Sequence, residues 1–339
     1  MKKKLNQMLT RELSRLSKND IAVAGGKGAS LGELTKAKFP VPSGFVVLAE
    51  AFKRFLAETD LNVEVEAILG KVNHQDINSV DKASNEIRDL IADAEFPPDI
   101  GEEVKKEFKR LGAQFVAVRS SATAEDSAVA SWAGELESYL NVDEAGLLEA
   151  VKKCWSSLFT PRAIFYRFEK KLHKQPVAVA VVVQTMIQSE ISGIVFTVHP
   201  VTEDKDQMVI EAGYGLGEAI VGGKITPDTY IINKLTLRPA LRRRLWRGEQ
   251  AQGIIAEAIM DKNISSQKIK IVRQGSGVVE VEVEAGERDK QKLTDEKILE
   301  LADTCVKIEK HYNSPQDIEW AFAEDKVYIV QSRPITTLR

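Results

Sequence analysis

The sequence predicts an α+β protein of two lobes that meet at a cleft. At 339 residues the chain is long enough for two domains of about 150 residues each. Its first half is rich in charged, helix-forming stretches, whereas short apolar runs typical of strands dominate after residues 184–188. We therefore expect two domains, 1–185 and 186–339, each of which combines helices with a sheet.

In the first domain, charged helical sequence alternates with short apolar strands. An apolar run over 21–29 breaks at Gly25-Gly26-Lys27-Gly28, and a helix is expected at 30–38. Gly70, Pro97-Pro98 and Pro161 should interrupt the later helices. The remaining expected elements are strands at 45–48, 115–119 and 138–142, and helical sequence over 50–110 and 144–172.

In the second domain, strands are the main element. The sequence predicts a hairpin around Gly275-Ser276-Gly277, and a helix at 297–312 with Thr294 as its N-cap. Residues 241–262 are expected to be helical or irregular. The expected strands are 177–186, 194–198, 208–211, 229–233, 268–272, 278–283, 318–323 and 327–332.

Composition excludes several classes of protein. The net charge of −3 offers no general attraction to nucleic acid or to an anionic membrane. One basic run, from Arg238 to Arg247 with Trp246, is interpreted as a solvated helix face rather than a nucleic-acid site. The longest uninterrupted apolar run, 177–183, is far too short to span a bilayer.

The N-terminus and the cysteines indicate where the protein works. No apolar segment follows Lys2-Lys3-Lys4, so we expect no signal peptide. Cys154 and Cys305 match no metal-binding spacing and are expected to be two buried thiols in a reducing compartment. These features predict a cytoplasmic protein.

Two glycine-containing loops and one arginine are candidates for phosphate binding. In the loop around Lys27, glycines would let backbone N–H groups approach a phosphate, and the lysine adds positive charge. Arg119 ends an apolar strand and needs an anionic partner, either a phosphate or a carboxylate such as Glu125 or Asp126. The segment Trp132-Ala133-Gly134-Glu135 is either a second phosphate-covering loop or a hairpin tip.

The two closing strands predict a metal site. With period two, Asp317, Glu319, Ala321 and Ala323 lie on one face of the first strand, and Val327, Ile329, Gln331 and Arg333 on one face of the next. A three-residue loop, 324–326, places Glu319 opposite Gln331, whereas a two-residue loop places Gln331 on the wrong face. A carboxylate beside an amide oxygen suits Mg²⁺ carrying a nucleotide phosphate. The alternative is a cross-strand hydrogen bond on a solvated face.

Taken together, these motifs resemble the nucleotide-binding domain of the pyruvate dikinases. This family holds phosphoenolpyruvate synthase, pyruvate phosphate dikinase and rifamycin phosphotransferase. The resemblance extends from about Gly25 to Pro334. The segments that carry it are Gly25–Leu31, Val118–Ala122, Ala133-Gly134, Tyr214–Glu218, Pro315–Trp320 and Val330–Pro334.

The resemblance implies a two-lobed ATP-grasp fold with the ATP cleft between the lobes. It also implies the role of individual residues in binding Mg²⁺ and ATP. Lys27, Arg119 and Arg333 would contact phosphates, Gly134 and Ser138 would belong to the loop over the triphosphate, and Gln184 would lie near the adenine. Glu319 and Gln331 would bind the metal, and Arg119 and Arg333 would act in catalysis.

The sequence departs from the family pattern at three points. Glu135 stands where glutamine is common, and His199 stands where aspartate or asparagine is usual. Family enzymes pass the phosphoryl group to a histidine in a Gly-Gly-…-Ser-His context. None of the four histidines, His74, His173, His199 and His311, has that context. The chain is therefore expected to act with a histidine domain supplied in trans or absent from this piece.

The resemblance implies half of a dikinase reaction. ATP would give a phosphoryl group to a histidine on a separate domain or chain and leave as AMP and phosphate, with pyruvate reached only through domains absent here. The same half-reaction in a rifamycin phosphotransferase-like or pyruvate phosphate dikinase-like system is an alternative. A non-catalytic ATP-binding regulatory module is another, and an ATP-grasp ligase fits the fold but not the motifs.

Overall fold

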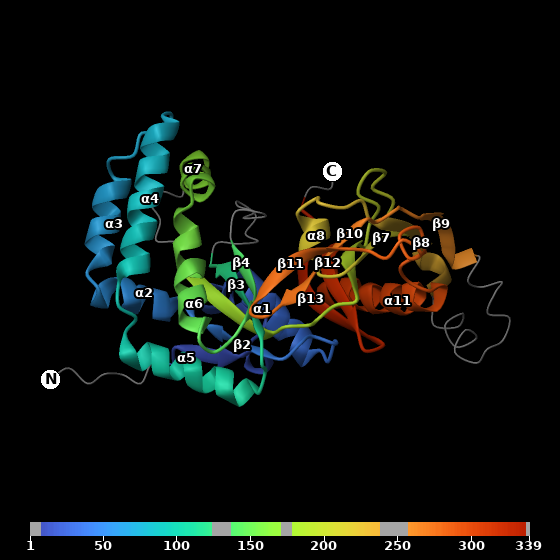
Figure 1. Ribbon diagram of the computed structural model, residues 1–339, viewed down its shortest axis with the longest axis horizontal. Helices are drawn as coiled ribbons and strands as arrows, with labels where there is room; N and C mark the ends of the chain where they lie inside the picture. Colours follow the sequence, from blue (N-terminus) through green and yellow to red (C-terminus); the bar gives the residue numbers. More distant parts are fainter. Residues whose placement is uncertain (1–7, 124–136, 171–177, 238–256, 337–339) are drawn as a thin grey trace. The chain divides into compact units, whose positions relative to one another are not determined.

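The computed structural model describes residues 8–123, 137–170, 178–237 and 257–336 (Figure 1). The chain forms two compact units. Unit 1 comprises Met1–Ala37 and Ser43–Met186, and unit 2 comprises Lys38–Pro42 and Ile187–Arg339. Both contain helices and a sheet, so the predicted α+β class is confirmed. The short segment 38–42 belongs to unit 2 because the Pro40 carbonyl accepts a hydrogen bond from the Ile329 amide at 2.8 Å.

Unit 1 is built on a five-stranded antiparallel sheet. Its central strand, β5, is apolar on both faces, and residues 179–183 are fully buried. Helices account for this burial, because α1 packs on one face, and α2 and α6 pack on the other. The strand order is β1 (Thr10–Glu12), β2 (Gly44–Val47), β5 (Val179–Thr185), β3 (Val116–Ala122) and β4 (Ser138–Val142).

The helix breaks predicted at Gly70, Pro97-Pro98 and Pro161 are present in unit 1. Gly70 is the C-cap of α3, and Pro97 and Pro98 start α5. Pro161 stands at the start of α7, whose N-cap Thr160 accepts a hydrogen bond from the Ala163 amide. The helices are α1 (Ile21–Lys36), α2 (Ala49–Glu58), α3 (Leu61–Leu69), α4 (Ile77–Asp93), α5 (Pro98–Leu111), α6 (Leu147–Ser156) and α7 (Pro161–Glu169).

The start of α1 differs from the expectation of an apolar run and a loop. Residues on both sides of Gly25 are helical, and only Gly25 itself, with φ 70° and ψ 171°, leaves the helical conformation. The helix therefore restarts directly after Gly25, which places Lys27 in the first turn of its main part.

Unit 2 is built on a six-stranded antiparallel sheet. The helix α11 (Asp295–Tyr312) packs against β12 and β7, where the buried face holds Ile318, Trp320 and Ile210. The strand order is β13 (Lys326–Pro334), β12 (Gln316–Ala323), β6 (Ile191–Phe196), β7 (Gln207–Tyr214), β8 (Asp228–Asn233) and β9 (Ile259–Asn263). Beside it lie a short helix, α8 (Glu218–Val221), and a two-stranded hairpin, β10 (Ile269–Gln274) and β11 (Gly277–Glu282).

Two local predictions for unit 2 have opposite outcomes. Thr294 is the N-cap of α11, and its side chain accepts a hydrogen bond from the Lys297 amide, as predicted. The stretch 241–262 was expected to be helical or irregular, but its end forms the edge strand β9. Edge strands in which polar residues dominate, such as this one, give a weak apolar signal. The basic run Arg238–Arg247 lies outside the described residues.

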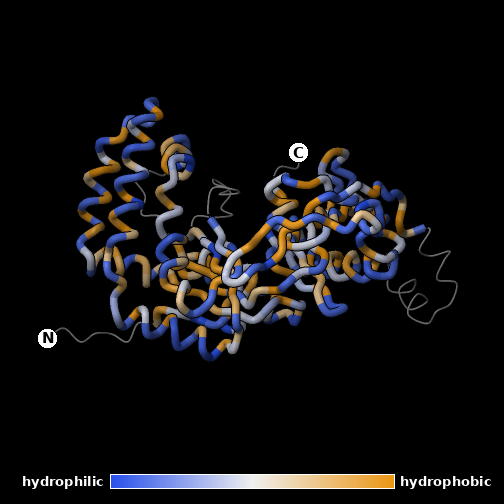
Figure 2. Tube along the Cα trace, viewed as in Figure 1, coloured by the Kyte–Doolittle hydropathy of each residue, from blue (hydrophilic) through white to orange (hydrophobic). Residues whose placement is uncertain are grey.

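Hydropathy along the chain follows this architecture. The helices α3 and α4 alternate hydrophilic and hydrophobic residues along their length (Figure 2).

Trp155 is fully buried in unit 1, with its ring 5.0 to 5.7 Å from the rings of Phe52, Phe55 and Phe96. Within the described residues, no helix combines the length and the apolar character needed to cross a bilayer.

A buried ion pair holds unit 2 together beneath β8. The ammonium of Lys292 lies 3.0 Å from the carboxylate of Asp228, and both side chains are completely buried. Asp228 also accepts hydrogen bonds from the Tyr230 hydroxyl and the Ser265 amide. The pair thus ties the strand to two loop segments, since Lys292 donates to the carbonyls of Ser265 and Arg288.

Removal of this pair should destabilise unit 2 strongly. We expect Lys292→Met to lower the free energy of unfolding by about 3–5 kcal/mol, because the buried Asp228 side chain loses its ion-pair partner. Lys290→Met, at an exposed pair with Glu287, is the matched control and should change stability little. Urea unfolding of both variants measures these losses. Equal losses in the free energy of unfolding would contradict the view that burial makes the Lys292 pair more important than the Lys290 pair.

Candidate functional site

Three of the predicted binding residues of unit 1 share one face of its sheet. Arg119 on β3 pairs directly with Ser138 on β4, and Gln184 on β5 pairs with Ala117, two residues before Arg119. Directly paired residues of antiparallel strands point to the same side, so these side chains lie on a common face. Lys27 reaches this face from α1. The next residue, Gly28, packs on the side chain of Val46, which lies in the same cross-strand row as Arg119.

The four residues differ in exposure. Gln184 is buried, Lys27 and Arg119 are partly exposed, and Ser138 is exposed. Gly134 and Glu135, together with the carboxylates of Glu125 and Asp126, lie outside the described residues. The predicted loop over the triphosphate is therefore described only at Ser138.

Strand β3 holds the glycine loop of α1 in place. The Ser121 hydroxyl donates to the Ala24 carbonyl at 2.9 Å and accepts from the Gly28 amide at 3.1 Å. The Lys27 ammonium donates to the Ser120 carbonyl at 2.8 Å. A methyl group on Gly25 would lie 2.3 Å from the Ser121 carbonyl oxygen, so this loop requires glycine for contact as well as for its positive φ.

Behind β3 lies a buried cysteine with no nucleophilic character. The Ser120 hydroxyl lies 2.9 Å from that of Ser157, and Ser157 donates to the Cys154 carbonyl at 2.7 Å. Burial raises the pKa of the Cys154 thiol to about 12. Burial also raises the pKa of Cys305, and both cysteines are free and buried, as predicted. The thiols therefore stay neutral and act as apolar core groups.

In unit 2, the closing hairpin places Glu319 directly opposite Gln331, and this pairing is confirmed. The predicted three-residue loop is wrong: Ala323 pairs with Lys326, and the turn consists of Glu324 and Asp325 alone. Both turn residues have positive φ, 51° and 61°, as in a type I′ hairpin turn. The pairing survives because the register shifts between Glu319 and Trp320.

The register shift is a β-bulge in β13. Trp320 pairs with Ile329, and Glu319 pairs with Gln331, so Val330 is the extra residue. The predicted common face of β13 is therefore wrong. Val327 and Ile329 lie with Trp320 on the buried face, whereas Gln331 and Arg333 lie with Glu319 on the other.

Arg333 is already engaged on this face. Its Nε and Nη2 atoms donate to one carboxylate oxygen of Asp317, at 2.9 and 2.7 Å. Burial raises the pKa of the Asp317 carboxyl, the Arg333 guanidinium lowers it, and the charge of Glu319 raises it again. The net pKa shift is upward, so the arginine offsets only part of the cost of burying this carboxylate.

Glu211 is a further acidic residue on this face that the sequence did not reveal. Glu319 pairs with Ile194 on β6, and Ile194 pairs with Glu211 on β7, so both glutamates lie in one row on one face. Burial raises the pKa of the Glu211 carboxyl, and the charge of Asp317 raises it further. The signal in the sequence is faint, because Glu211 stands at the end of the apolar run that predicts this strand and belongs to no motif by itself.

The donor atoms on this face suit a hard divalent cation. Glu319 offers carboxylate oxygens and Gln331 an amide oxygen, the ligand types that Mg²⁺ prefers. Within the described residues, no group of three or more His, Cys, Asp or Glu side chains is arranged to hold a metal ion. A cation bound by this pair would therefore take its other ligands from water and from phosphate oxygens, which is common for Mg²⁺.

The departure at His199 has a structural explanation. Its Nδ1 atom accepts hydrogen bonds from the amides of Val201 and Thr202, each at 3.2 Å. An aspartate or asparagine oxygen at this position would accept from the same amides two and three residues further on. Histidine thus replaces the usual residue as the acceptor that closes this turn.

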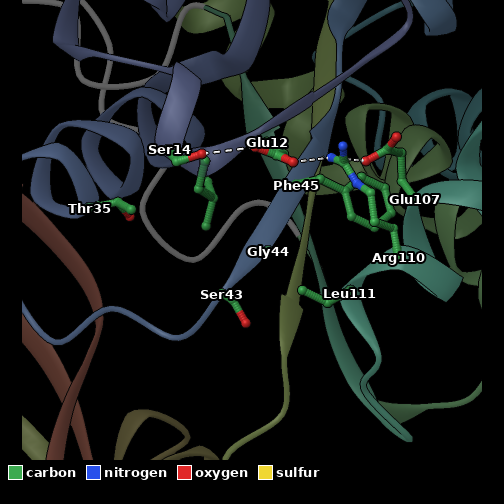
Figure 3. A pocket seen from close by; sticks show the side chains of 10 residues that line it. Glu12, Ser14, Thr35, Ser43, Gly44, Phe45, Glu107, Arg110 and Leu111 are labelled. Atoms are coloured by element: carbon green, nitrogen blue, oxygen red, sulfur yellow. Dashed lines mark hydrogen bonds and ion pairs between the residues drawn. The ribbon is translucent and has the colours of Figure 1, made fainter.

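A surface cavity in unit 1 lies apart from the predicted site residues. It has a volume of about 310 Å³ and is lined by residues that include Glu12, Glu107 and Arg110. Figure 3 shows the guanidinium of Arg110 between the two carboxylates, and both contacts are ion pairs. None of Lys27, Arg119, Ser138 and Gln184 lines this cavity.

Replacement of Gly25 should damage unit 1 through a contact, not merely through backbone conformation. We expect Gly25→Ala to lower the free energy of unfolding by about 3 kcal/mol or more, because its methyl group meets the Ser121 backbone. Gly112→Ala is the matched control: φ is 68°, but no atom lies within 4 Å, so a cost of about 1 kcal/mol is expected. If urea unfolding gave the same loss of free energy for both variants, the contact with Ser121 would not be the cause.

Glu211 should make stability depend on pH. A carboxyl with a raised native pKa binds its proton more tightly in the folded state. Stability is therefore lost as pH rises from the ordinary value of 4.5 through the native pKa. Without divalent cations, Glu211→Gln should match the wild type in melting temperature near pH 4 and exceed it near pH 7.

The control for this effect is Glu280→Gln, a change of the same kind on the exposed face of β11. It should show no comparable gain over the wild type between the two pH values. An advantage of Glu211→Gln that is the same at both pH values would contradict the titration of Glu211.

Comparison with known proteins identifies the family of the chain. Residues 21–339 match the family described as "Pyruvate phosphate dikinase, AMP/ATP-binding domain". A probable phosphoenolpyruvate synthase of Methanocaldococcus jannaschii is 43% identical over 335 residues, covering 96% of this chain and 26% of the relative. A probable phosphoenolpyruvate synthase of Archaeoglobus fulgidus is 44% identical over 333 residues, covering 96% of this chain and 41% of the relative.

The phosphoenolpyruvate synthase of Pyrococcus furiosus is 42% identical over 372 residues, covering 96% of this chain and 43% of the relative. The chain thus spans less than half the length of each of these relatives. The match covers both units, with the glycine loop of unit 1 and the closing hairpin of unit 2. The chain belongs to the pyruvate phosphate dikinase AMP/ATP-binding domain family.

Proposed function

We propose that this chain binds Mg–ATP and passes a phosphoryl group to a histidine on another domain or chain, as part of a phosphoenolpyruvate synthase-like enzyme. The observation that carries the proposal is the bulged hairpin, which sets Glu319 opposite Gln331 and Asp317 opposite Arg333. The proposed metal ligands, Glu319 and Gln331, and the arginine proposed to bind phosphate, Arg333, then lie on one face of the hairpin. The names of the relatives favour the synthase over the antibiotic-modifying alternative.

The proposed fold is the ATP-grasp fold, in which one nucleotide contacts both units. Unit 1 would serve as the phosphate-gripping domain and unit 2 as the metal-binding domain. Mg²⁺, held by Glu319 and Gln331, would neutralise charge on the phosphate oxygens. Lys27 and Arg119 would bind the phosphates from the face of unit 1, with Gly134 and Ser138 covering them and Gln184 near the adenine.

Arg119 and Arg333 would act in catalysis by stabilising charge. Phosphoryl transfer needs little covalent help from the protein, so positioned cations supply most of the effect. Asp317 fixes the guanidinium of Arg333 through two hydrogen bonds to one oxygen, so the arginine is oriented before a nucleotide arrives. Preorganised charge of this kind requires no rearrangement during the reaction.

The proposed half-reaction balances with water as the second acceptor. A histidine nitrogen attacks the β-phosphorus, the bond from the β-phosphorus to the oxygen of the α-phosphate breaks, and AMP leaves. Water then takes the γ-phosphoryl group as phosphate, and the β-phosphoryl group stays on the histidine. Pyruvate would receive that group only on domains beyond this chain. The proposed location is the cytoplasm, where the two free thiols remain reduced.

The test of this proposal is phosphoryl transfer in a reconstituted pair. The chain is mixed with Mg–ATP labelled at the β-phosphorus and with a separately produced histidine domain from one of the synthase relatives. Label on the histidine together with stoichiometric AMP supports the proposal. Tight ATP binding with no label on that domain, while the relative's own nucleotide-binding domain labels it, would favour a regulatory binding module.

The metal assignment makes a separate prediction. Glu319→Gln should weaken ATP binding in the presence of Mg²⁺ by about tenfold or more, because the cation loses the charged member of the proposed ligand pair. Binding measured in EDTA should change little, and so should the melting temperature. Glu324→Gln, in the exposed turn of the same hairpin, is the control. Calorimetric titration with the same affinity for Glu319→Gln and wild type would contradict the assignment.

A further inference from the structure

We infer that Ser121 is a positioning residue for the proposed phosphate site, which it builds by clamping the glycine loop around Lys27. The inference rests on the proposed function of Lys27 and extends it to a residue that contacts no phosphate itself. Ser121 lies on β3, two residues after Arg119, and its side chain points to the same face. It is completely buried, so its effect must pass through the residues that it holds.

The hydroxyl of Ser121 bonds to both ends of the loop. It donates to the Ala24 carbonyl, which precedes Gly25, and accepts from the Gly28 amide, which follows Lys27. A hydroxyl is the smallest side-chain group that can donate and accept at once. One side chain therefore fixes the two points between which the loop turns and Lys27 stands.

The Gly28 bond also completes the start of a helix. Because Gly25 leaves the helical conformation, the Gly28 amide lies in the first turn of the main part of α1, where capping groups commonly accept hydrogen bonds from the amides. An N-cap side chain normally satisfies such amides from the same chain segment. Here Ser121 does so from a neighbouring strand, which fixes the first helical turn, and with it Lys27, relative to β3.

Contacts with the adjacent residue give the clamp its precision. The Lys27 ammonium donates to the carbonyl of Ser120, so one dipeptide of β3 fixes both the backbone and the tip of this lysine. The Gly25 position approaches Ser121 so closely that an added methyl group would overlap it. Without the Ser121 hydroxyl, the loop would keep its packing but lose the two hydrogen bonds that fix its position relative to β3.

Ser121→Ala should therefore impair recognition of the phosphate chain and spare the rest of the nucleotide. We expect binding of Mg–ATP to weaken about tenfold and binding of AMP to change less than about twofold. Ser157→Ala is the matched control, since it removes a buried serine hydroxyl with two partners on the opposite face of β3. It should leave the ratio of ATP to AMP affinity unchanged. Ser121→Cys, nearly equal in size, should shift the ratio in the same direction if the alanine variant does not fold.

A double-mutant cycle with Lys27→Met tests whether Ser121 acts through the lysine. If it does, Ser121→Ala should change ATP affinity less than about twofold once Lys27 is methionine. A full tenfold effect in that background would overturn the inference. So would an equal loss of ATP and AMP binding, or wild-type binding by both Ser121 variants.

Failure of the proposed function would look different. In that case the wild-type chain itself would bind Mg–ATP no better than AMP, and Lys27→Met would have no effect. Wild-type preference for ATP that depends on Lys27, combined with an inert Ser121, would refute only the clamp.

Discussion

The extra residue in β13, Val330, determines which side chains share the polar face of unit 2. With a regular ladder from the two-residue turn onward, Glu319 would face Val330, and Gln331 and Arg333 would be directed to the buried side. The bulge reverses the alternation at one position, so the buried pair of Trp320 and Ile329 is followed by the polar pair of Glu319 and Gln331. The ion pair between Asp317 and Arg333 depends on the same shift. The proposed metal ligands and the arginine proposed to bind phosphate thus share one face because of one irregularity in one hairpin.

In unit 1, the irregular element is the helix α1, which breaks at Gly25 because the backbone conformation of that residue is not helical. The helix lies on the face of the unit 1 sheet that carries Arg119. Strand β3 compensates with Ser121, and the same strand carries Arg119, so the lysine and the arginine are fixed to one rigid element. In both units a local departure from regular structure determines where a charged side chain lies, and the strands around it fix that position. Such departures are frequent at functional sites, where they aim side chains that a regular element would direct elsewhere.

Much of this architecture could be predicted from the sequence, because its signals are local. Apolar runs revealed most of the strands, and Gly70, Pro98 and Thr294 marked helix ends through their own conformational and capping preferences. The pairing of Glu319 with Gln331 was predicted, but for the wrong reason. A two-residue turn and a bulge give the same pairing as a three-residue turn, and nothing in Glu324-Asp325-Lys326 distinguishes the two. Glu211 was missed because its neighbours on the face come from β6 and β12, which only the sheet order brings together. The Ser121 clamp was missed for the same reason, since 97 residues separate it from Ala24.

The proposed function requires that one Mg–ATP molecule contact residues of both units. Hydrogen exchange with and without Mg–ATP tests this requirement, because the amides of each unit report separately. We expect saturating Mg–ATP to slow exchange in the glycine loop of α1 and in β3, and also in the hairpin of β12 and β13, at the same nucleotide concentration. In Glu319→Gln the protection of the hairpin should be lost with Mg–ATP at the same level. Protection confined to one unit, at a concentration that saturates binding, would contradict the claim.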